Sequence, residues 1–165
     1  MLRHSALVCA SIILASGVVA AQPTVTVDIS QLKGPRPLED QTKAAAIRDY
    51  LESWQGMNEA FQQDQPTLLE EDFIGTAKDK LADAIDEQAK AGIQTRYHDR
   101  AHHIQFVFYS PEGLSIELID DAEYDVQVLD HDKPVSTVPV SARYIVVLTP
   151  AEVRWKVRVL QADSK

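Results

Sequence analysis

The last third of the chain alternates apolar and polar residues with a period of two, and this pattern limits the fold more than any other feature. It covers residues 122–129, 135–148 and 154–160. Successive side chains of a strand point to opposite faces, so the alternation predicts an antiparallel sheet with one packed face and one wet face. The packed rows expected for the three strands are Ala122, Tyr124, Val126 and Val128; Val140, Ala142, Tyr144, Val146 and Leu148; and Trp155, Val157 and Val159.

The middle of the chain has the spacing of three helices followed by further strands. Residues 38–61 place apolar side chains three and four positions apart, as in an amphipathic helix. Pro66 ends this segment, and Thr67 with Glu70 has the spacing of a capping box for a short second helix. A third helix is expected from residue 75 or 76 to a stop at Gly92. The period then falls to two, and after a turn at 111–113 residues 114–118 form another short strand. The packed row before that turn is expected to be Ile104, Phe106 and Phe108, with Tyr109 on the other face.

Helices before a strand meander predict an α+β fold in which N-terminal helices cover one face of an antiparallel sheet. We assign residues 38–162 to this one domain. Residues 22–37 alternate at Val25, Val27 and Ile29 and then reach a Gly-Pro-Arg-Pro cluster at 34–37, so we interpret them as an extended arm and linker. The pattern leaves open whether the arm pairs with the sheet or stays disordered.

The first 21 residues have the composition of a secretory signal peptide. They begin with a basic Arg3, continue through an apolar run at 6–20 and end on Ala20 and Ala21. Cleavage after Ala21 predicts an exported protein, periplasmic or extracellular, that no longer inserts in a membrane. An uncleaved anchor is the alternative, although the run is shorter than the roughly 20 residues of a membrane-spanning helix. The single cysteine, Cys9, lies in this segment, so a mature chain has none.

The charge balance excludes several classes of partner. Sixteen Lys and Arg face 25 Asp and Glu, a net charge of −9. Removal of residues 1–21 takes away Arg3 and leaves −10, from −9 minus 1. Such a surface repels phosphate backbones and anionic headgroups, so we expect no nucleic acid partner and no membrane association. The sequence also lacks a Walker loop, a nucleophile elbow and a His-Glu-x-x-His motif, and we expect no cofactor.

Residues 96–103 hold the one cluster with the residue types of metal or acid–base chemistry. His98 and His102 are four apart, the spacing of two ligands on one helical face, but they lie where a helix is expected to give way to a strand. In a strand, His102 and His103 point to opposite faces and cannot share one ion. We therefore interpret the segment as a polar linker with a surface histidine pair, and we expect no metal site.

Aromatic side chains dominate the rows expected to face inward. They are candidates for an apolar ligand pocket, and packing as ordinary core is their other interpretation. No Asp or Glu falls on these rows, which argues against a buried acid–base pair. A register error of one residue would move Asp121, Glu123 and Asp125 inside, so this inference depends on the phase of the sheet. The candidate pocket residues are Tyr50, Trp54, Phe106, Tyr124, Tyr144 and Trp155.

With this order of elements, four short motifs give the chain a resemblance to the nuclear-transport-factor-2-like superfamily, within the cystatin-like folds. They are Ala-Lys-Ala-Gly-Ile at 89–93, Ala-Glu-Tyr at 122–124, Arg-Tyr-Ile-Val at 143–146 and Trp-Lys-Val at 155–157. Within this superfamily, these motifs are similar to those of the non-catalytic Tim-type translocase domain and the chloroplast-division IMS-type domain. The resemblance implies a curved sheet forming a cone, a pocket between the first helix and the sheet, and often a homodimer through the outer sheet face.

Two functions from different classes remain on the sequence evidence. The first is an exported, non-enzymatic binding or interaction domain whose partner is a protein or a small apolar ligand, favoured because no acid–base pair faces inward. The second is a small cofactor-free isomerase or dehydratase of the ketosteroid-isomerase or polyketide-cyclase type. That alternative would need polar side chains such as Asp99 or His102 to reach the mouth of the cone.

Overall fold

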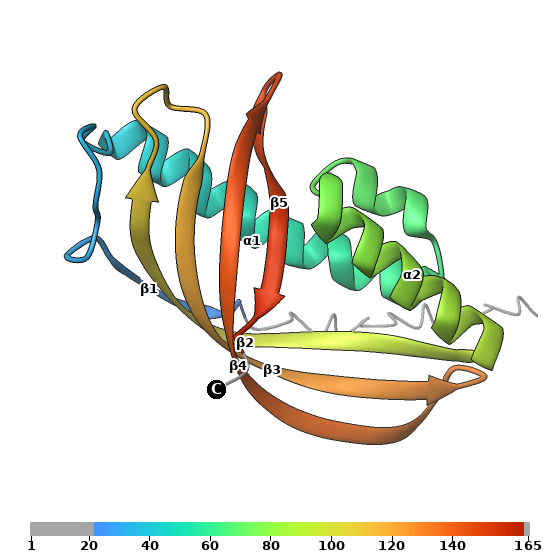
Figure 1. Ribbon diagram of the computed structural model, residues 1–165. Coiled ribbons are helices and arrows are strands. Elements are labelled where there is room, and N and C mark those ends of the chain that lie inside the picture. Colours follow the sequence, from blue (N-terminus) through green and yellow to red (C-terminus); the bar gives the residue numbers. More distant parts are fainter. Residues whose placement is uncertain (1–21, 164–165) are drawn as a thin grey trace, which may run out of the picture.

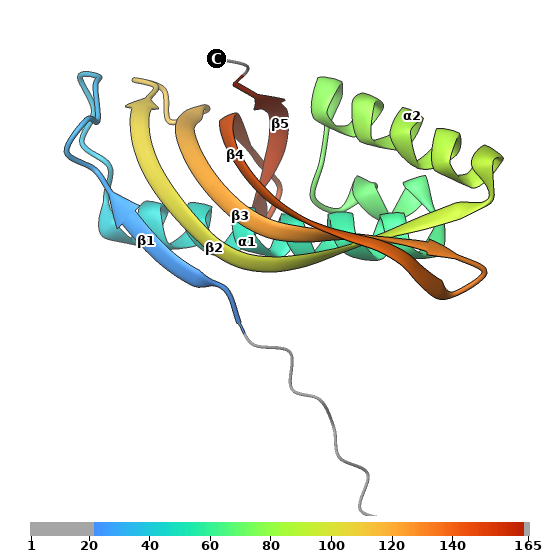
Figure 2. The ribbon, with the colours of Figure 1, turned by 90° about the horizontal axis from the view of Figure 1, so that it is seen from below.

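The computed structural model describes residues 22–163 as two α-helices, a 3₁₀ helix and one curved five-stranded sheet. The signal peptide expected at residues 1–21 lies outside this range. The strands follow one another in chain order across the sheet, β1-β2-β3-β4-β5. Figures 1 and 2 show the sheet bent around the helices, which lie on its concave side. The architecture is α+β, as the order of the sequence patterns predicts.

The three expected helices are present, with one difference at their starts. Helix α1 spans Asp40–Gln63 and helix α2 spans Gly75–Ala91, and Gly92 ends the latter with a left-handed φ of 70°. The short helix between them, η1, is a 3₁₀ helix at Pro66–Glu70. It begins at its proline, with Gln65 as N-cap and no side-chain capping bond, so the predicted capping box at Thr67 is wrong. Proline is favoured at the first position of a helix because an N–H group at that position would have no intrahelical partner, so its absence costs nothing.

The strands are longer than the sequence pattern indicates. Strands β4 (Lys133–Ala151) and β5 (Arg154–Ala162) follow the prediction, whereas β2 extends over Ile93–Tyr109. Residues 96–103, expected to be a polar linker, therefore belong to β2. Strand β3 runs without interruption over Ile116–Asp130, where two separate segments were expected. Long cross-strand pairing with both neighbours holds these polar stretches in the sheet.

The residues before α1 include a fifth strand. Strand β1, Thr24–Asp28, pairs parallel to β2, from Thr24 opposite Ala101 to Asp28 opposite Gln105. A further parallel bridge joins Lys33 to Phe108. The sheet is consequently mixed, with four antiparallel strands and one parallel edge strand.

Four register shifts interrupt the pairing of neighbouring strands, and those described next change which residues face the core. A register shift between Phe106 and Phe108 leaves Phe108 exposed and buries Tyr109, opposite to the expected faces of these two side chains. A second shift between Val147 and Leu148 places Leu160 rather than Val159 against the core. An extra residue in one strand reverses the alternation beyond it, so a period of two cannot locate a bulge.

The core fills the space between α1, α2 and the concave face of the sheet. Helix α1 contributes a nearly continuous buried stripe, and β2, β3 and β4 contribute alternate residues. None of the helices within residues 22–163 is long and apolar enough to cross a membrane. The largest fully buried apolar side chains are Tyr50, Leu69, Phe73, Ile85, Ile104, Phe106, Ile116, Leu118, Leu129, Val146 and Leu148.

Candidate functional site

A chain of four polar side chains crosses the interior of the cone. Tyr50 of α1 donates a hydrogen bond from its hydroxyl to Asp120 Oδ2 at 2.8 Å. His102 Nδ1 lies 2.6 Å from the same oxygen, and His102 Nε2 lies 3.0 Å from Asp99 Oδ2. The side chains of His102 and Asp120 are 0 % exposed and that of Asp99 is 23 % exposed, so the chain runs from the deepest core to the surface.

This constellation corrects two expectations from the sequence. The interior does contain an acid, and His102 is a buried residue rather than one of a surface pair. The phase of the β3 row was right from Ala122 to Val126, and Asp120 precedes Ala122 by two positions on the same face. At the end of the row, where the register shifts, Leu129 is buried and the expected Val128 is only partly buried. The predicted strand simply started too late to include Asp120. Extending the row by one more pair of residues would have found Asp120, and His102 precedes Ile104 on the packed row of β2 in the same way.

The carboxylates determine the charge state of the buried histidine. Burial by itself lowers the pKa of His102, but hydrogen bonds and negative charge from Asp120 and Asp99 outweigh it and raise the pKa to about 9. The imidazole is therefore protonated at neutral pH and donates through both nitrogens. Burial and the neighbouring Asp120 also raise the pKa of Tyr50 well above its usual value, so its hydroxyl stays a donor.

Of the six predicted pocket residues, Tyr50 belongs to this chain, and Trp54, Tyr124 and Tyr144 pack around it. The Trp54 ring lies 5.0 Å from the His102 ring, 5.4 Å from Tyr124 and 5.7 Å from Tyr144. The hydroxyls of Tyr124 and Tyr144 are 2.6 Å apart, and the ring of Tyr50 is 6.1 Å from His102. Such edge-on packing leaves little space between the rings.

The other two predicted pocket residues lie apart from this aromatic group. Phe106 is fully buried in the core, and Trp155 is partly buried on β5. The backbone N–H of Trp155 donates to Asp49 Oδ2 on α1 at 2.8 Å. Trp155 lines a separate pocket of about 300 Å³ between α1 and the β4–β5 hairpin, so the structure does not bring it or Phe106 together with the other four residues.

The space next to the buried chain is small. A cavity of about 60 Å³ is lined by Trp54, Gln55, Asn58, Tyr97 and Asp99. It continues into an open cleft of about 530 Å³, which shares the last four of these residues and adds Gln22, Pro23 and His98. Within residues 22–163, the buried atoms Trp54 Nε1, Asp99 Oδ1 and Asp120 Oδ1 have no hydrogen-bond partner.

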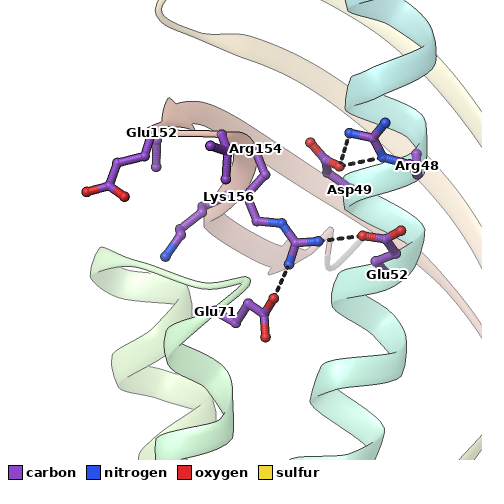
Figure 3. Close-up of a pocket in the computed structure, with 9 residues that line it drawn as sticks. Arg48, Asp49, Glu52, Glu71, Glu152, Arg154 and Lys156 are labelled. Carbon is purple, nitrogen blue, oxygen red and sulfur yellow. Dashed lines mark hydrogen bonds and ion pairs between the residues drawn. The ribbon is translucent and has the colours of Figure 1, made fainter.

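A larger pocket lies elsewhere, between α1 and the β4–β5 hairpin. It has a volume of about 640 Å³ and is lined mainly by charged side chains. Figure 3 shows Arg154 pointing between Glu52 of α1 and Glu71, just after η1, and bonded to both. Arg154 also donates to Asp72 Oδ1 at 2.6 Å. The guanidinium of Arg154 is therefore already bound by three carboxylates. These ion pairs connect the β4–β5 hairpin to α1 and to the segment after η1.

The convex face of the sheet carries an apolar stripe, and the helices within residues 22–163 lie on the other face (Figures 1 and 2). Its members alternate with core residues along their strands and pair with one another, Ile119 with Ile145 and Val147 with Val159. A shallow groove of about 490 Å³ crosses the β2 side of this stripe, where Phe108, Lys33 and Arg143 lie among its lining residues. We call the residues Phe108, Ile119, Ile145, Val147 and Val159 the outer stripe.

The part of the chain that the structure describes has no group of three His, Cys, Asp or Glu side chains placed to hold a metal ion. The four-residue spacing of His98 and His102 does not bring these two side chains together, because both lie in a strand rather than a helix. His98 lines the open cleft, whereas His102 is enclosed between Asp99 and Asp120.

Comparisons with known proteins identify the fold. No protein-family model matches the chain, and no curated protein matches it in sequence. Among solved structures, the intermembrane space region of the chloroplast protein ARC6 superposes with a TM-score of 0.61 at 15 % identity, over 79 % of this chain and 100 % of that one. A candidate scytalone dehydratase from Novosphingobium aromaticivorans gives a TM-score of 0.50 at 13 % identity, over 76 % and 89 %. A protein from Catenulispora acidiphila gives 0.50 at 13 %, over 74 % and 95 %.

The chain thus has the nuclear-transport-factor-2-like cone fold, as the resemblance in its sequence implies. At these identities the likeness establishes the architecture. It does not select a function, because this fold carries both enzymes and binding modules.

Proposed function

We propose that the protein is an exported, non-enzymatic binding domain. The observation that carries this proposal is the enclosure of His102, whose side chain is 0 % exposed and whose two ring nitrogens both contact carboxylates. A general acid or base must reach the proton it moves. The space that adjoins the buried chain itself is only about 60 Å³, and the wider cleft of about 530 Å³ lies outside Asp99, away from the ring of His102.

Chemical modification tests this enclosure directly. Diethyl pyrocarbonate acylates accessible, unprotonated imidazole, so we expect His98, which is exposed, to react much faster than His102. Peptide mass spectrometry of the briefly treated, folded protein measures both rates, and urea-unfolded protein provides the control for intrinsic reactivity. Modification of His102 as fast as that of His98 would contradict the proposal, because it would mean that the interior opens to small molecules.

The isomerase or dehydratase alternative retains one favourable observation. Asp99 connects the buried histidine to the open cleft, so a proton could pass between His102 and a substrate held there. Rapid modification of His102 in the experiment above would favour this alternative. Slow modification agrees with an imidazole that is both enclosed and held protonated by its two carboxylates.

Export is proposed on the composition of the first 21 residues. A basic start, an apolar run and a small-residue end are the parts of a cleavable signal, and the remainder of the chain has no cysteine. Expression of the full chain in a Gram-negative host, followed by cell fractionation and N-terminal mass spectrometry, tests both cleavage and location. We expect a periplasmic protein that begins at Gln22, and an intact cytoplasmic chain would overturn this part of the proposal.

We further propose that the outer stripe binds a second copy of the chain. Phe108 is 36 % exposed, and β-branched side chains of three neighbouring strands continue its apolar surface. Lys33 and Arg143 flank the groove together with Glu117, so a two-fold arrangement can place opposite charges across the contact. The resemblance to a superfamily that often dimerises through this face agrees with this choice.

Sedimentation velocity on two matched variants tests the dimer. Val147→Asp puts a charge into the outer stripe, whereas Val138→Asp puts the same charge at an exposed position on the other face of β4. We expect the wild type and Val138→Asp to sediment as dimers and Val147→Asp as a monomer with an unchanged circular dichroism spectrum. A wild type that is still monomeric at a protein concentration of about 100 micromolar, where even a weak dimer forms, would refute the proposal.

A further inference from the structure

The two residues before β1 lie outside the sheet. Strand β1 starts at Thr24, opposite Ala101 of β2, and forms one edge of the sheet (Figure 2). Gln22 and Pro23 precede it in extended chain, and Gln22 is exposed. Pro23 has no N–H group, so the first backbone donor after Gln22 belongs to Thr24. A change confined to the nitrogen and side chain of Gln22 therefore leaves the pairing of β1 with β2 intact.

Gln22 faces an open cleft rather than the packed core. It lines the cleft of about 530 Å³ beside α1, whose other lining residues include Gln55, Asn58 and His98. An exposed side chain at the rim of such a space can exchange among its staggered rotamers without displacing core residues. The carboxamide of Gln22 can consequently fold back toward the backbone nitrogen of its own residue.

Signal cleavage gives this nitrogen a new reactivity. Cleavage after Ala21 turns the amide nitrogen of Gln22 into a primary α-amine, whose usual pKa is about 8, so roughly a tenth of it is unprotonated at neutral pH. The unprotonated amine attacks Cδ of the Gln22 carboxamide, a carbon–nitrogen bond forms and ammonia leaves. The product is the five-membered lactam pyroglutamate. Both reacting groups belong to one residue, so the step needs no oxidant and no second reactant.

We propose that the mature protein carries pyroglutamate at position 22, formed by spontaneous cyclisation of Gln22. This inference rests on the proposed export, because an uncleaved chain has no α-amine at this position. The lactam is neutral, so cyclisation removes the positive charge that cleavage creates at the N-terminus. The cleft that His98 and Asp99 line then gains no ammonium group. The blocked N-terminus also withstands aminopeptidases, which require a free α-amine.

Mass spectrometry of the N-terminal peptide tests the modification on protein purified from the periplasm. Free amines are first dimethylated on the folded protein, so that cyclisation during digestion cannot imitate the result. Lys80, which is exposed on α2, reports whether labelling is complete. We expect an N-terminal peptide that begins at residue 22, carries no label on its α-nitrogen and is lighter by one ammonia than the unmodified peptide.

Gln22→Ala is the matched control, because it keeps a small residue after the cleavage site and cannot cyclise. Its N-terminus should be fully labelled. A wild type that begins at Gln22 and still has a labelled α-amine after prolonged incubation at neutral pH would overturn the inference and leave export intact. Cyclisation seen only after unfolding in urea would overturn it as well, because the fold would then restrain Gln22. A chain that keeps residues 1–21, or begins elsewhere, would overturn the proposed cleavage and this inference with it.

Discussion

The charge of His102 predicts a specific loss of stability on raising the pH. The buried carboxylates raise the pKa of this histidine from 6.5 to about 9 in the folded protein, whereas the unfolded chain keeps the usual value. The folded state therefore binds the proton more tightly. Its contribution is fully present below pH 6.5 and is lost as the pH rises through 9. About 2.5 pH units at about 1.4 kcal/mol each give a loss of about 3 kcal/mol, to order of magnitude.

Urea unfolding followed by tryptophan fluorescence measures this loss. Measurements at about pH 6, 7, 8 and 9 span the range between the pKa of His102 in the unfolded chain and in the folded protein. The matched comparison is His102→Gln, which keeps a polar side chain but cannot titrate, and His98→Gln serves as the control because His98 is exposed. We expect the free energy of unfolding of the wild type and of His98→Gln to fall by about 3 kcal/mol relative to the trend of His102→Gln. Readings stop at pH 9 because tyrosines of the unfolded chain titrate near pH 10.

Parallel pH trends for the wild type and His102→Gln would refute the reasoning. They would mean that His102 is not held protonated between its two carboxylates. If His102→Gln does not fold, Asp99→Asn tests the same cause, because removal of one of the two carboxylates lowers the pKa of His102 and moves the loss of stability to lower pH.

Four substitutions, in three experiments, test the packing of the protein. Gly56→Ala should destabilise the protein by about 1–2 kcal/mol in thermal or urea unfolding, because the new Cβ would lie 2.3 Å from Asp72 Oδ2. This clash outweighs the helix preference of alanine, which is about 1 kcal/mol. A stabilised variant would contradict the contact. Trp155→Ala should lower stability by about 3 kcal/mol, measured by urea unfolding, and an unchanged midpoint would mean that β5 does not pack on the core. Tyr144→Phe and Tyr124→Phe should show a coupling energy of about 1 kcal/mol in a double-mutant cycle, and additive effects would refute the bond between their hydroxyls.

Several features of the fold follow from local chemistry and were predictable. The spacing of apolar residues located α1 and α2, and Gly92 marked the end of α2 because it adopts a left-handed conformation there. Alternation gave the phase of β3 and β4, including the inward direction of Tyr124 and Tyr144. These features depend only on neighbours in the chain, so the sequence contains them.

The polar residues of the interior could not be assigned in this way. An aspartate such as Asp120 is the residue type expected in a turn or on the solvent-exposed face of a strand. It is buried because Tyr50 and His102, from other elements, form hydrogen bonds with its carboxylate. His102 likewise lies in a stretch whose polarity indicated a linker. A buried charge is tolerated only when partners surround it, and those partners are distant in the chain. Their identity becomes visible only when α1, β2 and β3 are assembled.

The sequence by itself determined an α+β domain with helices first, a half-buried meander behind them, and the composition of an exported protein. Its alternating strands contain enough periodic information to orient most side chains. The tertiary structure decided the rest: where bulges reverse the faces, that the aromatic residues fill the cone, and that a histidine lies between two carboxylates. Periodicity is a property of one segment, whereas enclosure and hydrogen-bond satisfaction arise between segments, so only the folded chain could show that the interior is packed and polar at once.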